Sequence, residues 1–267
     1  MDYLIFLVIG VLMGLFGGLL GIGGSIIMIP ALVFVFGENQ HLYQASAMIC
    51  NFFVGLGAVL VHRKADVLVG DVVKWLVPFA VIGIIIGVAI SNSSVFARGN
   101  SYLLAKLYGV FALYVVVYNL LMFRRGRGGG DGFDISRTRR SVGLTILCGV
   151  LTGILAGLLG IGGGIVCVPL QQFFLKMPLK RAISNSAATI ASISLFGAFY
   201  KNVTLGAHGM AMMESLKIAV CVIPGAVVGA FLGGRAMHKL PVNLVRAVFI
   251  VLCILACYKL LTVSAGV

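Results

Sequence analysis

Two clusters of glycine in an apolar chain could form an anion-binding site from backbone atoms. Both interrupt long apolar runs, and their residues are Gly21, Gly23, Gly24 and Ser25 in the first and Gly160, Gly162, Gly163 and Gly164 in the second. Since each glycine costs a helix interior roughly 1 kcal/mol relative to alanine, we expect the helix to stop at each cluster. A helix restarting there would present unpaired N–H groups and its positive dipole end, which bind anions.

Polar side chains inside apolar segments could complete such a site, because hydroxyl and amide groups bind an oxyanion without net charge. The predicted substrate-binding side chains are Ser25, Ser46, Asn51, Gln171, Asn185, Ser186 and Thr189. The same groups also serve as ordinary hydrogen bonds between helices, so both interpretations stay open. Carboxylates are nearly absent from the apolar segments, which argues against a cation pathway.

Signatures of catalysis and metal binding are missing from the sequence. The chain has no HExxH or GxSxG motif and no paired carboxylates within an apolar segment. Its six cysteines lie in apolar runs without metal-ligand spacing. We therefore expect no enzyme, no catalytic residues, no metal and no cofactor, and a purely structural membrane protein remains an alternative.

The composition requires membrane helices to position these residues. Of 267 residues, 61% are hydrophobic and only 10% are charged, whereas soluble domains carry about 25% charge. The net charge of +13 could suggest nucleic acid, but the basic residues sit mostly in short loops, as in membrane proteins. We expect an all-α polytopic bundle with membrane lipid around it and no nucleic-acid partner; a homo-oligomer stays open.

The apolar segments fall into two groups of four. They cover about 3–36, 42–62, 72–92, 101–123, 141–175, 182–204, 210–236 and 241–264. The predicted domains are a first membrane repeat over 1–123, a basic cytoplasmic linker over 124–140 and a second repeat over 141–267. GLLGIGG occurs in both halves, PFAVIGIIIG matches PGAVVGAFLG, and QASAMICNFFVGLGA aligns with SNSAATIASISLFGA at an offset of 140.

The loop charges favour an inverted arrangement of the two halves. A first segment of about 34 residues is too long for one straight span, since a span needs about 20. If it folds back as a re-entrant hairpin at GLLGIGG, each half crosses three times and 15 of the 20 basic residues lie on the linker's side. Four crossings per half leave only 12 there, so the positive-inside rule favours the inverted repeat.

Glycine pairs spaced four apart have a simpler interpretation. They are Gly14 and Gly18, Gly83 and Gly87, Gly153 and Gly157, and Gly229 and Gly233. Such pairs let two helices approach closely in a membrane. We interpret them as packing positions.

The doubled GLLGIGG followed by proline, the two Pro-x4-Gly-x3-Gly segments and the basic linker resemble the sulfite exporter TauE/SafE family, also called the toluene-sulfonate uptake permease family. The resemblance implies a multi-pass inner-membrane permease for small sulfur-containing anions such as sulfite and sulfonates. Family members commonly carry a threonine near the start of the second segment of each half, where this chain has Ala45 and Ser46, and Asn185 and Ser186.

The resemblance and the predicted neutral anion site together favour transport of a small anionic substrate. An inside-negative potential favours anion export by about 2.3 kcal/mol per charge per 100 mV. We therefore expect export by alternating access between the two repeats. An anion channel that uses the same backbone-lined site is the alternative.

Overall fold

A computed structural model describes residues 2–64, 68–93, 96, 101–124, 138 and 141–236, together with single residues at 247, 250, 251, 254, 257, 258 and 261. Nearly all of the predicted linker over 124–140 lies outside the described residues, as does most of the segment 241–264.

The described residues form helices and contain no β-strand. The elements are α1 (Asp2–Leu20), α2 (Ser25–Phe36), α3 (Gln40–Lys64), α4 (Gly70–Ser91), α5 (Ser101–Arg124), α6 (Val142–Leu159), α7 (Gly164–Phe174), α8 (Leu179–Val203), the 3-10 helix η3 (Leu205–His208) and α9 (Met212–Ala236). Within the described ranges, six helices are long and apolar enough to cross a membrane, namely α1, α3, α4, α6, α8 and α9. The all-α polytopic class is confirmed.

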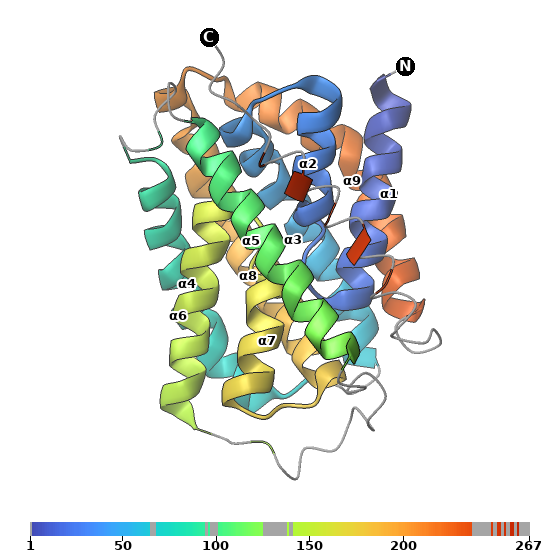
Figure 1. Ribbon diagram of the computed structural model, residues 1–267, viewed down its shortest axis with the longest axis vertical. Helices are drawn as coiled ribbons and strands as arrows, with labels where there is room; N and C mark the ends of the chain where they lie inside the picture. Colours follow the sequence, from blue (N-terminus) through green and yellow to red (C-terminus); the bar gives the residue numbers. More distant parts are fainter. Residues whose placement is uncertain are drawn as a thin grey trace.

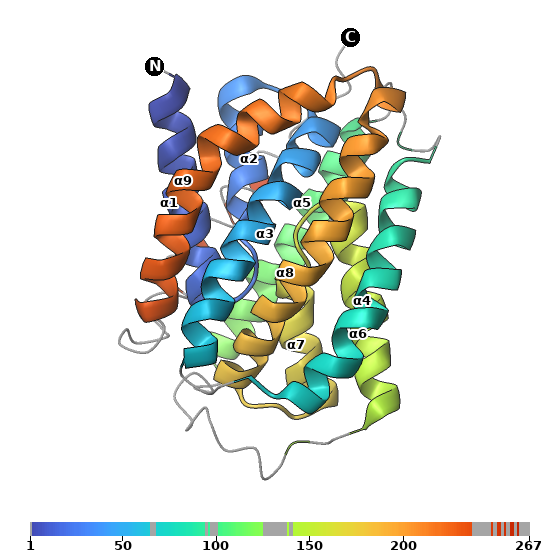
Figure 2. The same cartoon turned by 180° about the vertical axis from the view of Figure 1, so that it is seen from behind.

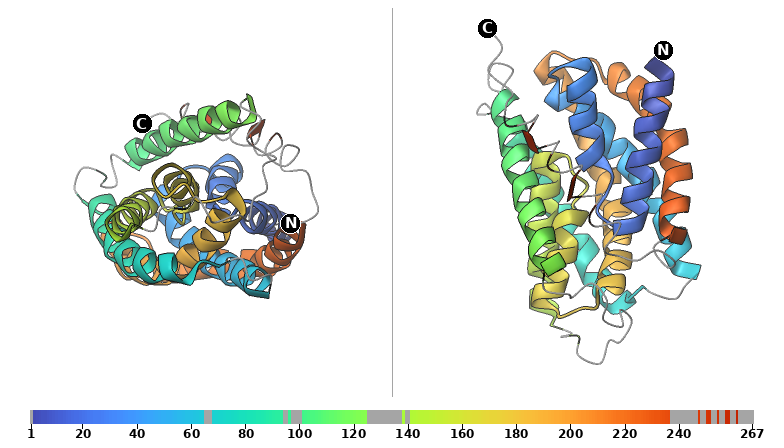
Figure 3. Two further views of the ribbon diagram at one scale, coloured as in Figure 1. Left: turned by 90° about the horizontal axis from the view of Figure 1, so that it is seen from below. Right: turned by 45° about the vertical axis from the view of Figure 1, so that its right-hand side comes forward.

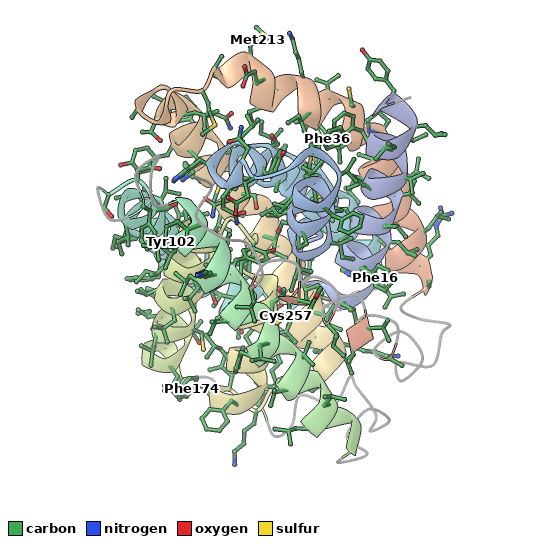
Figure 4. All side chains as sticks on the ribbon, turned by 45° about the horizontal axis from the view of Figure 1, so that its top comes forward. Phe16, Phe36, Tyr102, Phe174, Met213 and Cys257 are labelled. Atoms are coloured by element: carbon green, nitrogen blue, oxygen red, sulfur yellow. The ribbon has the colours of Figure 1, made fainter. Side chains whose placement is uncertain are left out.

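Two helical hairpins enter the bundle from opposite ends (Figure 1). Helix α1 runs inward from the end where the chain begins, and α2 returns to that end. Helix α6 runs inward from the opposite end, and α7 returns there. With 12 and 11 residues, α2 and α7 are each less than about 20 Å long. In Figure 4, Phe36 at the end of α2 and Phe174 at the end of α7 accordingly lie far apart.

Glycines hold each hairpin's first helix against a long helix of the other half. Helix α1 runs beside α9, and α6 runs beside α4 (Figure 2). A Cβ atom added to Gly14 would collide with the carbonyl oxygen of Ala226, and one added to Gly83 would lie 2.5 Å from that of Val150. Only glycine permits this approach, so the packing interpretation of the glycine pairs is confirmed.

Helices α3 and α8 cross at the centre of the bundle, with α5 on its outside (Figure 3). A Cβ atom on Gly55 would lie 2.7 Å from the Ala191 nitrogen, and one on Gly197 would lie 3.1 Å from the Met48 sulfur. Gly55, the later of the two α3 residues, thus meets Ala191, the earlier of the two α8 residues, so the two helices are antiparallel. They carry most of the polar side chains predicted for the site.

Candidate functional site

The first hairpin turns at a short non-helical segment between Leu20 and Ser25. Gly21 and Gly23 have φ angles of +60° and +73°. These values lie in the left-handed region, which glycine adopts without the steric cost that a Cβ atom brings. The four residues between α1 and α2 therefore reverse the chain inside the bundle.

The second hairpin turns in the same way between Leu159 and Gly164. Gly160, Gly162 and Gly163 all have φ angles between +70° and +79°. Helix α6 ends and α7 begins at these glycines. We call the segments 21–24 and 160–163 the first and second breaks.

The two breaks are in contact. A Cβ atom added to Gly164 would lie 2.5 Å from the Cα atom of Ile22 and would collide with the carbonyl oxygen of Gly21. A Cβ atom added to Gly23 would lie 3.1 Å from the carbonyl oxygen of Ile161. The chain thus brings together two glycine clusters that are 139 positions apart.

Asn51 of α3 links the two breaks. Its side chain is fully buried, and its Oδ1 accepts a hydrogen bond of 3.1 Å from the Gly24 N–H. Its Nδ2 donates to the Ser25 hydroxyl at 3.0 Å. A Cβ atom on Gly162 would lie only 2.7 Å from this Nδ2. One amide therefore caps the start of α2 and touches the second break.

The amino-terminal ends of α2 and α7 provide backbone hydrogen-bond donors inside the protein. The N–H groups of Ser25 and Ile26, and those of Gly164 and Ile165, have no acceptor in the described part of the chain. These are the N–H groups that a helix leaves unpaired at its start, and each helix adds the positive end of its dipole. Two such ends at touching breaks favour a bound anion.

Hydroxyl groups from α8 and α6 surround the breaks. Ser186 is fully buried and donates to the carbonyl oxygen of Gly21 at 2.6 Å. Thr152 of α6 is also fully buried, and a Cβ atom on Gly163 would lie 2.8 Å from its Cγ2. The Thr152 hydroxyl lies beside the Cys167 thiol of α7 and makes no hydrogen bond of standard geometry among the described residues. Thr152 could not be identified from the sequence, because one threonine in an apolar helix carries no distinguishing signal.

A second buried polar group lies on α7 and α8. The Gln171 Nε2 is 3.0 Å from the Cys167 sulfur, and its Oε1 accepts from the Asn185 Nδ2 at 3.2 Å. The Asn185 Oδ1 accepts from the Val69 N–H at 2.9 Å. The Thr189 hydroxyl donates to the carbonyl of Asn185 within α8, at 2.9 Å. These predicted site residues are buried, but their hydrogen bonds are with α7, α8 and the start of α4 rather than with the breaks.

Ser46 faces α9 instead of the breaks. Its hydroxyl donates to the carbonyl oxygen of Leu42 at 2.9 Å and lies 3.3 Å from the Ser215 hydroxyl. These contacts are those of a hydroxyl that joins two helices. The structure therefore brings together the two breaks, Asn51 and Ser186, and leaves Ser46 apart from them.

Lys201 is a charged residue inside the bundle. The charge count assigns it only to a side of the membrane, and the structure places it in the last turn of α8, fully buried. Its sequence position, within the predicted apolar segment 182–204, agrees with this placement. Within the described residues, no cluster of His, Cys, Asp and Glu could hold a metal ion.

Comparisons with known proteins point to one family. The model of the family described as "Sulfite exporter TauE/SafE" matches residues 6–260. The chain is 29% identical to the probable membrane transporter protein MamO of Magnetospirillum gryphiswaldense, over 93% of this chain and 43% of MamO. It is 30% identical to the probable membrane transporter protein MJ0441 of Methanocaldococcus jannaschii, over 72% and 69% of the two chains.

A further relative matches along its whole length. The probable membrane transporter protein YunE of Bacillus subtilis is 26% identical over 96% of this chain and 97% of its own. The chain spans less than half the length of the MamO proteins that it matches. No solved structure matches significantly.

Proposed function

Because the chain belongs to the sulfite exporter TauE/SafE family, we propose that it carries small sulfur-containing anions out of the cell. It is a multi-pass protein of the bacterial inner membrane, as its six apolar helices and its relatives indicate. One observation carries the proposal: the amino-terminal ends of α2 and α7 meet around Asn51 inside the bundle. We propose no catalytic activity.

The proposed site binds the anion mainly through backbone N–H groups. Sulfite and sulfonates expose several oxygens that each accept a hydrogen bond, and the two helix starts offer four N–H groups without an acceptor in the described part of the chain. Ser186 and Thr152 add hydroxyl groups that can rotate toward a ligand. Because these groups are neutral, the site would release an anion more readily than a salt bridge would.

Matching glycine contacts support an inverted repeat of residues 1–123 and 141–267. A Cβ atom on Gly14 would meet the carbonyl oxygen of Ala226, and one on Gly153 would meet that of Ala80. Gly14 and Gly153 are 139 positions apart in the sequence, and Ala80 and Ala226 are 146 positions apart. The contact between α1 and α9 thus has a counterpart between α6 and α4, in the opposite direction along the bundle.

The contacts of α3 and α8 support the same relation and adjust the sequence alignment by one residue. Ser46 contacts Ser215 of α9, and Asn185 contacts Val69 at the start of α4. Ser46 and Asn185 are 139 positions apart, and Val69 and Ser215 are 146 positions apart, as in the glycine contacts. The offset of 140 taken from the sequence pairs Ser46 with Ser186, whereas the contacts favour pairing it with Asn185.

We propose alternating access between two units that each combine elements of both halves. One unit is the first hairpin with α9, and the other is the second hairpin with α4. Each pair is held by close backbone contact at glycines, so it would move as one body against the central α3 and α8. An anion channel with the same site is the second candidate, favoured by the neutral, backbone-rich lining.

A flux measurement tests the substrate class. The full chain is reconstituted in liposomes with a potassium gradient and valinomycin to set the potential, and sulfite, thiosulfate, methanesulfonate and acetate are offered in turn. We expect saturable flux of the sulfur anions that follows the potential, since 100 mV is worth about 2.3 kcal/mol per charge. Flux that does not saturate would favour the channel, and no flux of any sulfur anion would contradict the proposed substrate class.

Cysteine labelling tests the inverted arrangement. In a variant without the native cysteines, Glu38→Cys and Gly209→Cys are placed in the loops after α2 and after η3, and Gly129→Cys is placed in the linker. The inverted model predicts that a membrane-impermeant maleimide added to whole cells labels the first two positions and not the third. Four crossings per half place position 209 inside and leave the other two positions unchanged, so absence of labelling at Gly209→Cys from outside would contradict the inverted arrangement. Permeabilised cells serve as the control.

A further inference from the structure

A lysine is fully buried where α3 begins and where α4 and α8 end. Lys201 Nζ lies 2.8 Å from the Ser91 Oγ, 2.9 Å from the Asn92 Oδ1 and 3.0 Å from the His41 Nδ1. Its side chain has no exposed surface. None of these three partners is a carboxylate. We call Lys201, His41, Ser91 and Asn92 the lysine cage.

The hydrogen bonds of the lysine cage fit one positive charge. The His41 Nε2 lies 2.9 Å from the carbonyl oxygen of Phe96, which can only accept, so Nε2 carries a hydrogen. The Ser91 hydroxyl donates to the Gln44 Oε1 at 3.3 Å. Ser91, Asn92 and the His41 Nδ1 can then each accept one of the three N–H groups of an ammonium.

The ends of two helices stabilise this charge without a carboxylate. Lys201 lies in the last turn of α8, Ser91 is the last residue of α4, and Asn92 is its C-cap. Each helix end carries a partial negative charge that favours a nearby cation. Glu38 and Glu214 lie near the same end of the bundle but are exposed, and neither is a hydrogen-bond partner of Lys201.

A chain of hydrogen bonds connects the lysine cage to the second break. The Gln44 Nε2 donates to the carbonyl oxygen of Leu158 at 3.4 Å, one residue before the end of α6. A Cβ atom on Gly160 would lie 2.6 Å from the Gln44 Cγ. Gln44 therefore contacts the second break and, through Ser91, the ammonium of Lys201.

We propose that the lysine cage is a second anion-binding site, which holds a small oxyanion between one end of the bundle and the breaks. A buried ionisable group in a membrane protein is costly and generally functional. The helix ends supply only partial negative charge, so a bound anion supplies the full opposite charge that no partner side chain among the described residues supplies. An anion oxygen replaces the Asn92 Oδ1 as a partner of Lys201, and the Asn92 side chain, whose Nδ2 donates to the Thr204 Oγ1 at 2.7 Å, shifts at the helix end to admit it. That this anion is the transported substrate rests on the proposed function. That the lysine cage binds an anion does not depend on it.

A binding measurement in detergent tests the cage without any flux. The unfolding midpoint of the purified full chain is followed against sodium sulfite, with sodium gluconate at equal ionic strength as reference. We expect Lys201→Met to weaken the sulfite dependence about tenfold or more. Lys217→Met removes an exposed lysine of α9 near the same end and should behave like the wild type. Unchanged sulfite dependence in Lys201→Met overturns the proposal.

Lys201→Arg covers the case in which Lys201→Met does not fold. The guanidinium keeps the charge but is planar and wider, so it should still bind anions while changing the ratio of sulfite to methanesulfonate affinity about threefold or more. An unchanged ratio overturns the proposal. Absence of sulfur-anion flux in liposomes, combined with sulfite binding that depends on Lys201, would overturn the proposed function and support the cage.

Discussion

Gly162→Leu should abolish anion flux, and Gly23→Leu should do the same from the other break. Gly162 has a φ angle of +70°, and any Cβ atom there would lie 2.7 Å from the Asn51 Nδ2. Leucine thus brings both a strained backbone and a displaced Asn51. Since displacing a binding group by about 1 Å can cost about 10²-fold in rate, we expect flux of the transported anion to fall by at least about that factor.

The control for this pair of variants is a glycine in an unstrained, open position. Gly143 lies near the start of α6, its φ angle is not positive, and a Cβ atom there would meet nothing within 4 Å. Gly143→Leu should leave flux near the wild-type level. Gly162→Ala adds about 1–2 kcal/mol of strain, because alanine must adopt the left-handed backbone. Its flux should lie between those of Gly162→Leu and the wild type. Full flux by Gly162→Leu at normal expression would refute a role of the second break.

The all-α class and the membrane-spanning helices could be predicted because their signals are local. An apolar run of about 20 residues predicts a span wherever it occurs. Helix interruption by glycine is also a property of the nearby residues, and α1 and α6 indeed end at Leu20 and Leu159, beside the clusters. Gly14 and Gly83, as members of regularly spaced pairs, could be assigned to packing for the same reason.

Side-chain partners could not be predicted, because they depend on which helices meet. Ser46 and Ser186 look alike in sequence, yet Ser46 contacts α9 and Ser186 contacts the first break. The partners of Lys201, His41 of α3 and Ser91 of α4, are likewise set by which helices meet. Asn51 was a candidate among several polar residues, and only the fold shows that it caps α2 and touches Gly162.

Asn51→Asp should block transport while leaving the protein folded. A carboxylate keeps an acceptor for the Gly24 N–H and can accept from the Ser25 hydroxyl. It would also lie at the amino-terminal ends of two helices, where a negative charge is stabilising. The fold should therefore tolerate it at least as well as the amide, and the unfolding midpoint should not fall.

The same carboxylate would act as a permanent anion in the proposed site. Two like charges about 5 Å apart at an effective dielectric constant near 20 repel by about 3 kcal/mol, which corresponds to about 10²-fold in affinity. Flux in liposomes and the concentration for half-maximal flux measure the effect.

The pattern across these variants separates an anion site from a structural amide. If Asn51 only caps α2, then Asn51→Asp keeps both stability and flux, whereas Asn51→Ala loses stability by about 1–3 kcal/mol through the unpaired Gly24 N–H. If Asn51 lies in an anion site, Asn51→Asp keeps stability and loses flux. Normal flux by a folded Asn51→Asp protein would therefore contradict an anion site between the two breaks.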